Sequence, residues 1–306
     1  MNATVTAVEL DEMLKGGKAV TIIDTLPPEY YDQGHIPGAL NACVYEMVFL
    51  DRMAELVEKR DSRLVVYGSS DRSHGAEVAV EKLNRAGYRD VHELAGGLEA
   101  WSGNGFRLES SGSGQKEEAL VIADGRYAID AAASRLEWSG RNIAKGHHGT
   151  IAVSRGSISM ENGLPLSGEF VLDMNSIVNL DLEDEAYNSM LIRHLKSDDF
   201  FDVARYPTAT YSLGAAEPLP GATPGSPNYL LKGVLELKGQ QRPLNLATEV
   251  AVMEHGVLKA RAACDFDRTL WGVIYGSGRF FEKLGMHLVS DLVTVEIFLQ
   301  AVRQGG

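Results

Sequence analysis

The sequence predicts two domains, a parallel α/β domain followed by an all-β antiparallel barrel with a short helix at its mouth. The chain of 306 residues is longer than most chains that fold around a single hydrophobic core. Up to residue 106, short β-branched runs alternate with helical patterns, as in a parallel α/β sheet. After residue 125, apolar and polar residues alternate between turn residues, which is typical of an antiparallel barrel or sandwich.

Composition and charge limit the partners of both halves. With 44% hydrophobic and 23% charged residues, the chain has the composition of a globular protein. Residues 1–106 contain 10 basic and 17 acidic side chains, and the remaining residues contain 19 and 25, which gives the net charge of −13. Such a field repels polyanions, so no nucleic-acid partner is expected. An apolar, uncharged ligand is compatible with this negative charge.

The domain boundaries follow from a stretch of Gly, Ser and charged residues, Glu109–Glu118, which contains no apolar side chain that a core could bury. We expect a first domain over residues 1–106, a flexible linker over 107–124 and a second domain over 125–306. The first residues lack a signal-peptide pattern, and no segment reaches 18 consecutive apolar residues. We therefore expect a cytoplasmic protein without a transmembrane segment.

Two segments of the first domain carry a recognisable pattern. The run Val20–Asn41 contains a predicted strand that ends in Asp24, a Pro-Pro turn and the motif GHIPGA. The run Leu64–Trp101 contains a strand, a loop, a helix, a second strand and a Gly-Gly turn. Together they resemble the rhodanese family over about the first 105 residues. The resemblance implies a rhodanese-like parallel sheet with a functional loop after Tyr67.

The resemblance also shows what is missing from that loop. In rhodaneses, a cysteine closes the strand, and the backbone N–H groups of the loop stabilise its thiolate, which carries sulfur as a persulfide. Here Gly68 occupies the matching position and the loop is one residue shorter. A serine hydroxyl cannot replace the thiol, because its pKa lies far above about 8.5. No catalytic residue is assigned, and the vestigial loop comprises Gly68, Ser69, Ser70, Asp71, Arg72 and Ser73.

We therefore expect an inactive sulfurtransferase domain that recognises an unknown protein partner. Asp24 and His35 match the family and are expected to fix loop geometry. The alternative is a sulfurtransferase that uses a displaced thiol, Cys43, although a packed thiol is favoured there. Loss of thiosulfate-to-cyanide activity in Cys43→Ala would support the alternative.

The strands of the second domain are read from a period of two, which places each apolar set on one face of a sheet. About eight such strands close into a barrel. Between strands, apolar residues from Tyr187 to Leu195 follow a helical stripe, which places a short helix over one mouth. The apolar sets are Leu136 and Trp138; Phe170, Leu172 and Met174; Tyr229, Leu231, Leu235 and Leu237; every second residue from Leu258 to Phe266; and every second residue from Val293 to Leu299.

Four motifs of this domain, within Tyr127–Asp130, Asp173–Ile177, His194–Tyr211 and Phe266–Val273, resemble the YceI-like family over about 175 residues. The resemblance implies a lipocalin-like barrel that binds polyisoprenoid chains. The segment Arg279–Leu288, with two phenylalanines, departs from the family. The predicted ligand-binding residues are Leu136, Trp138, Phe170, Leu172, Met174, Met190, Leu191, Leu195, Phe200, Phe201, Tyr211, Leu235, Leu237, Phe266 and Trp271.

The expected ligand is an apolar, lipid-like molecule such as a polyisoprenoid or an isoprenoid quinone, and no cofactor is required. From the pattern alone, the same residues can also fill the barrel solidly, which would make the protein a ligand-free structural or stress-response interaction module. No metal site is predicted, because His147 and His148 are adjacent in a strand and point to opposite faces. Trp271 and Tyr275 are predicted either to line a second mouth or to pack in the core. A homodimer is kept as an alternative to a monomer.

Overall fold

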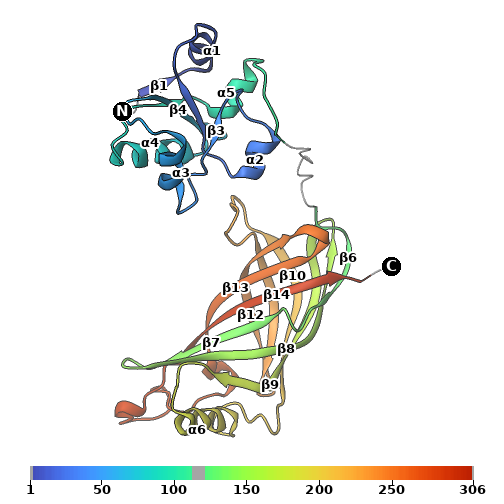
Figure 1. The fold of residues 1–306 in the computed structure, drawn as a ribbon. Coiled ribbons are helices and arrows are strands. Elements are labelled where there is room, and N and C mark those ends of the chain that lie inside the picture. The colour runs from blue at the N-terminus through green and yellow to red at the C-terminus, as the bar shows by residue number, and fades with distance from the viewer. Residues whose placement is uncertain (1–2, 112–120, 305–306) are drawn as a thin grey trace. The chain divides into compact units, whose positions relative to one another are not determined.

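A computed structural model describes residues 3–111 and 121–304, and Figure 1 shows two compact units. The predicted two-domain fold class is confirmed. The elements of the first unit are β1 (Ala3–Val5), α1 (Ala7–Lys15), β2 (Thr21–Asp24), α2 (Pro28–Gln33), β3 (Leu40–Asn41), α3 (Phe49–Leu56), β4 (Arg63–Tyr67), α4 (Gly75–Arg85), β5 (Asp90–Leu94) and α5 (Gly97–Gly103).

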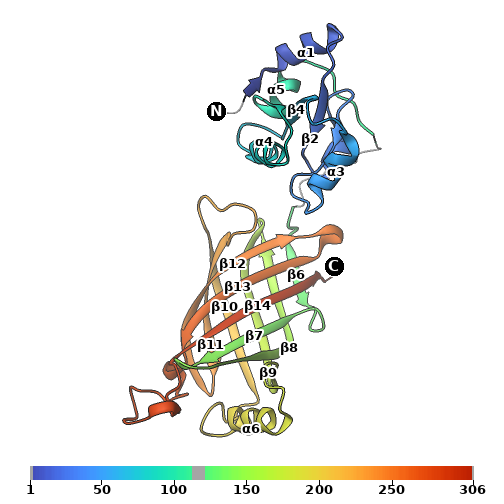
Figure 2. The same ribbon diagram turned by 60° about the vertical axis from the view of Figure 1, so that its left-hand side comes forward.

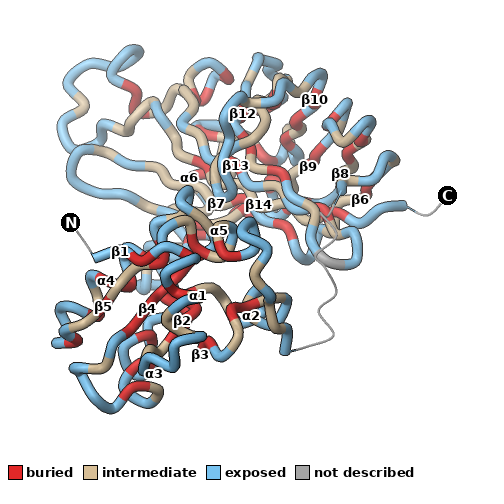
Figure 3. The backbone as a smooth tube through the Cα atoms, turned by 90° about the horizontal axis from the view of Figure 1, so that it is seen from above, coloured by how far each residue is buried: buried red, intermediate tan, exposed pale blue. Residues whose placement is uncertain are grey.

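The sheet of the first unit is parallel throughout, with the strand order β1-β5-β4-β2-β3. Its central strand β4 is buried on both faces, as Figure 3 shows. Leu64 and Val66 pack with residues of α3 and α4, whereas Val65 and Tyr67 pack with residues of α1 and α5. Helices therefore cover both faces of the sheet, as parallel strands require.

The first unit extends beyond its predicted end at residue 106. His35 and Glu109 exchange backbone hydrogen bonds, and Trp101 Nε1 donates to the carbonyl oxygen of Arg107. Residues 107–109 therefore belong to the α/β unit and not to the linker. Most of the predicted linker stretch, residues 112–120, lies outside the described residues.

The second unit contains one closed antiparallel sheet. Its elements are β6 (Gly125–Ile129), β7 (Arg135–Arg141), β8 (Gly146–Glu161), β9 (Leu164–Asn179), α6 (Glu185–Lys196), β10 (Thr208–Pro218), β11 (Tyr229–Leu237), β12 (Gln240–Val252), η1 (Glu254–Gly256), β13 (Leu258–Asp267), η2 (Arg268–Trp271), η3 (Gly285–His287) and β14 (Leu292–Arg303). Neighbouring strands pair in sequence order from β8 to β14.

Closure of the barrel depends on β6 and β7. Both strands pair with β8 on one side and with β14 on the other, so they share one position in the wall. The strands that the structure describes thus occupy eight positions. A barrel of eight strands has an interior that side chains can fill or that holds one small ligand.

The connections place four segments at one end of the barrel, which we call the α6 end (Figure 2). They are the β7–β8 turn, the β9–β10 connection with α6, the β11–β12 turn and the β13–β14 loop, which contains the segment Arg279–Leu288. The second mouth predicted near Trp271 and Tyr275 is therefore wrong, because these residues lie at the same end as the helix.

Within residues 3–111 and 121–304, none of the helices has both the length and the apolar composition of a membrane-spanning segment.

Candidate ligand cavity

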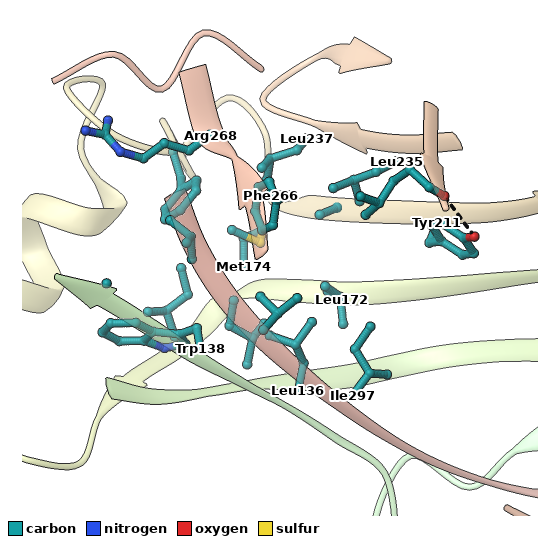
Figure 4. A pocket seen from close by; sticks show the side chains of 18 of the residues that line it. Leu136, Trp138, Leu172, Met174, Tyr211, Leu235, Leu237, Phe266, Arg268 and Ile297 are labelled. Atoms are coloured by element: carbon teal, nitrogen blue, oxygen red, sulfur yellow. Dashed lines mark hydrogen bonds between the residues drawn. The ribbon is translucent and has the colours of Figure 1, made fainter. Parts of the chain in front are cut away.

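The barrel is hollow. A cavity of about 350 Å³ runs through its interior, and its wall is almost entirely apolar (Figure 4). The predicted ligand-binding residues that line it are Leu136, Trp138, Phe170, Leu172, Met174, Leu191, Leu195, Phe200, Phe201, Tyr211, Leu235, Leu237 and Phe266.

Two predicted residues lie outside the wall. Met190 is 55% exposed on the outer side of α6, because only a narrow stripe of this helix, Leu191 to Leu195, faces the cavity. Trp271 is buried behind the wall, where its Nε1 donates to the carbonyl oxygen of Leu235 at 2.9 Å. Its ring packs edge-on against Phe266 at 5.3 Å, so Trp271 positions a lining side chain instead of touching the cavity.

The sequence missed the contribution of two strands to the wall. Ile151, Val153 and Ile158 of β8 line the cavity, as do residues of β12 from Leu244 to Val250. The cavity-facing residues of β8 change from odd-numbered (151 and 153) to even-numbered (158) along the strand. The change occurs because a β-bulge between Val153 and Arg155 shifts the register against β9. A bulge reverses the side-chain parity, which hides such a strand from a search for strict alternation.

The deep part of the cavity contains few polar atoms, and these are satisfied by the barrel itself. Tyr211 donates to the carbonyl oxygen of Leu244 at 3.1 Å, and burial raises the pKa of Tyr211 to about 12. Thr248 donates to the carbonyl oxygen of Leu246. Gly233 permits this arrangement, because a Cβ there would lie 2.4 Å from Cζ of Tyr211. The neutral interior therefore suits a hydrocarbon chain.

The cavity reaches solvent at the α6 end. Among the lining residues that the structure describes, Arg141 and Lys145 are exposed, and both flank the β7–β8 turn. His194 and Tyr275 form an aromatic group at this end, with ring centroids 4.6 Å apart. Trp138 also lines this region, and its Nε1 is buried without a partner among the described residues.

Cys264 and two acidic residues after α6, Asp199 and Asp202, make contacts within the fold. Burial, followed by the negative charge of Asp265, raises the pKa of the Cys264 thiol to about 11, so the thiol stays protonated. Asp202 adopts a left-handed conformation and its backbone organises the turn after α6. The carboxylate of Asp199 lies 3.5 Å from Nε2 of His194.

The vestigial loop of the first unit is held by hydrogen bonds from the backbone at the start of α5. The N–H group of Gly96 donates to Asp71 Oδ1 at 2.6 Å, and the N–H groups of Leu98 and Glu99 donate to loop carbonyl oxygens. A Cβ at Gly68 would lie 3.5 Å from the nitrogen of Ala76, an ordinary contact, so space alone does not require glycine there.

The surroundings of the vestigial loop are acidic. Burial, and then the charges of Glu77 and Asp71, raise the pKa of Glu93. Arg72 of the loop pairs with Glu99 at 3.4 Å on the surface. Cys43 is buried in the turn after β3. The carboxylates around the loop disfavour the binding of an anionic sulfur donor, such as the one that rhodanese chemistry uses.

Asp24 and His35 are buried in the first unit. Asp24 Oδ1 accepts from the N–H group of Leu26, and burial raises the pKa of this carboxyl. The imidazole of His35 stacks on Tyr31 at 3.8 Å, with its Nδ1 2.8 Å from the Tyr31 carbonyl oxygen. These contacts hold the segment before the GHIPGA motif and the histidine of the motif itself.

Comparison with known protein families matches this architecture. A family model described as "YceI-like domain" matches residues 127–301, which is more than half of the chain. The chain belongs to the YceI-like family. A second family model, described as "Rhodanese-like domain", matches residues 6–104. Both resemblances predicted from the sequence are confirmed.

Individual relatives of this YceI-like chain cover one domain each. BcnA of Burkholderia cenocepacia is 22% identical, with 57% of this chain and 99% of that chain covered and a TM-score of 0.43. A polyisoprenoid binding domain from Saccharophagus degradans is 14% identical, with 58% and 98% covered and a TM-score of 0.42. The HTH-type transcriptional regulator Rv0324 of Mycobacterium tuberculosis is 38% identical over 97 residues, or 32% of this chain. The chain spans 40% of the length of that regulator.

In the YceI-like domain, Arg268 holds the β13–β14 loop. It is 2% exposed, and its guanidinium donates to four carbonyl oxygens on either side of the loop, although burial lowers its pKa. The nearest acid is Asp291, at 3.9 Å. A buried guanidinium with this many acceptors fixes the loop across one side of the mouth. The acceptors belong to Ser290, Val273, Tyr275 and Val289.

A second polar network ties α6 to the barrel rim. Burial of the Asp181 carboxylate opposes ionisation, but hydrogen bonds from the His148 N–H group, His147 and Asn179 outweigh it and lower the pKa of Asp181 to about 2. Asn188 of α6 donates to the carbonyl oxygen of Asn179. The adjacent histidines His147 and His148 both lie near the Asp181 carboxylate, and His148 Nδ1 is 3.7 Å from it.

Proposed function

We propose that the YceI-like domain binds and carries a long apolar molecule, an isoprenoid or a similar lipid, inside the barrel. The single observation that supports this most strongly is the apolar cavity of about 350 Å³. Its volume lies within the range of small-molecule sites, about 300–1,000 Å³. An isoprenoid chain in water costs about 0.8 kcal/mol for each exposed CH₂ group, so transfer into a dry cavity favours binding without many polar contacts.

The filled-barrel alternative is less well supported, because the side chains of opposite walls leave a continuous space between them. The satisfied polar atoms of Tyr211 and Thr248 favour an apolar chain over a polar metabolite in the deep part. A cytoplasmic location and a homodimer stay predictions, as does the absence of a nucleic-acid partner.

Extraction of the purified protein tests this function. We expect organic extraction and mass spectrometry of protein from its native host to yield an isoprenoid-like molecule at about one per chain. We also expect the delipidated protein to bind retinol, a fluorescent isoprenoid alcohol, with saturation at one site. Protein that is empty after native purification and does not bind retinol would refute the carrier function.

We further propose that the rhodanese-like domain serves in recognition and not in catalysis. Gly68 at the nucleophile position and the closed, acidic loop support this proposal. The wild-type chain should show only background thiosulfate-to-cyanide activity, unchanged in Cys43→Ser. Activity that is lost in Cys43→Ser while the fold is retained would instead establish a sulfurtransferase with a displaced thiol.

A further inference from the structure

Large exposed apolar side chains gather around the mouth of the barrel. They come from three separate segments at the α6 end, namely the β7–β8 turn, α6 and the β13–β14 loop (Figures 1 and 2). Single exposed apolar residues are common on proteins, but a group at one functional opening indicates an interaction surface. We call the following residues the mouth collar: Ile143, Tyr187, Met190, Phe280, Phe281 and Met286.

The residues of the mouth collar are highly exposed. Ile143 and Met286 are 101% and 68% exposed, so neither packs into the barrel. Phe280 and Phe281, at 54% and 44% exposed, belong to the segment Arg279–Leu288 of the β13–β14 loop. Transfer of such side chains from water into an apolar phase is favourable in proportion to the apolar surface removed from water.

The collar is continuous with the cavity. Leu191 and Leu195 of α6 line the interior, while Tyr187 and Met190 of the same helix face outward. At the β7–β8 turn, Ile143 lies between Arg141 and Lys145, which are the exposed members of the described cavity lining. An apolar surface thus extends from the interior of the barrel to its outside at the opening.

Charge indicates which partner fits. Residues 141–148 contain Arg141 and Lys145 and no acidic residue, although the whole chain carries −13. Basic side chains beside exposed apolar side chains suit the boundary of a bilayer, where the aliphatic stems are buried and the cationic ends reach lipid phosphates. The first turn of α6 is acidic, so a zwitterionic bilayer suits the collar better than a strongly anionic one.

We propose that the mouth collar docks on the surface of a zwitterionic lipid bilayer, so that the ligand moves between bilayer and cavity without crossing water. The proposal of a docking surface depends only on the exposed apolar side chains of the collar and the charges beside them. The transfer step rests on the proposed carrier function.

Flotation of the full-length protein with phosphatidylcholine vesicles tests the docking. We expect the wild-type protein to float with the vesicles and Phe280→Ser/Phe281→Ser to reduce the bound fraction at least about tenfold. A matched control is Leu164→Ser/Leu166→Ser, which removes two exposed leucines (39% and 53%) from the opposite end and should leave flotation unchanged. Thermal unfolding of each variant checks the fold, and Ile143→Ser provides a second collar variant.

Three outcomes would overturn the proposal. These are a wild-type protein that does not float, equal loss in collar and control variants, and a wild-type dimer in sedimentation that the collar variant dissociates. The last result would assign the collar to contacts between two copies of the chain. Retinol titration separates the two proposals, because vesicle binding without retinol binding refutes the carrier function alone, and retinol binding without vesicle binding refutes the docking alone.

Discussion

Ala262→Phe is expected to weaken retinol binding by at least about 100-fold. Ala262 is buried on β13 and its side chain lines the cavity. A phenyl ring at this position would occupy space that about four CH₂-sized groups of the ligand need, and each group contributes about 0.8 kcal/mol. The loss of about 3 kcal/mol corresponds to more than a hundredfold in Kd. Fluorescence titration of the delipidated protein measures the change.

The neighbouring residue Ala263 provides the control. It lies on the same strand but is exposed on the outer face, because side chains alternate along β13. Ala263→Phe should therefore leave the Kd for retinol within about twofold of the wild-type value. If both variants bind retinol as the wild type does, the ligand does not occupy the barrel interior and the carrier proposal fails.

Trp271→Ala is expected to lower the free energy of unfolding of the YceI-like domain by about 3–5 kcal/mol. Trp271 is 2% exposed, packs against Phe266 and donates to the carbonyl oxygen of Leu235. Its removal leaves a cavity behind the wall and an acceptor without its donor. Urea denaturation measures the loss, and the rhodanese-like domain provides an internal reference because its transition should not move.

An exposed residue of the same domain provides the control for this prediction. Leu166→Ala removes a side chain that is 53% exposed, so it should change the free energy of unfolding by less than about 0.5 kcal/mol. An equally small effect of Trp271→Ala would mean that the tryptophan does not support the cavity wall as the structure indicates.

The inner faces of β13 and β14 were predictable from their unbroken alternation, whereas β12, which also alternates from Leu244 to Val250, was not identified from the sequence. On β13 and β14, every second residue from Ala260 to Phe266 and from Val293 to Leu299 faces the same side, and nearly all of these line the cavity. On β8, the bulge near Val153 reverses the parity, so the sequence pattern did not indicate its inner face. Register shifts of this kind depend on the partner strand, which a local pattern does not contain.

The helix over the mouth was predictable, but the orientation of its faces was not. The apolar stripe from Tyr187 to Leu195 predicted α6, yet Tyr187 and Met190 face outward. A helix on the rim contacts the barrel along a narrow line, so part of its apolar stripe remains exposed. The end of the first unit was also placed too early, because the pairing of Glu109 with His35 joins residues far apart in sequence.

Three features follow from the amino-acid sequence without the structure, because residue identity and side-chain alternation are local properties. They are the two fold classes, the absence of a cysteine at position 68 and most of the apolar cavity lining. Only the folded structure shows that the barrel is hollow, that Trp271 lies behind the wall and that the residues of the mouth collar gather at the α6 end. These features depend on strand register and barrel closure, which bring together residues from segments far apart in the chain.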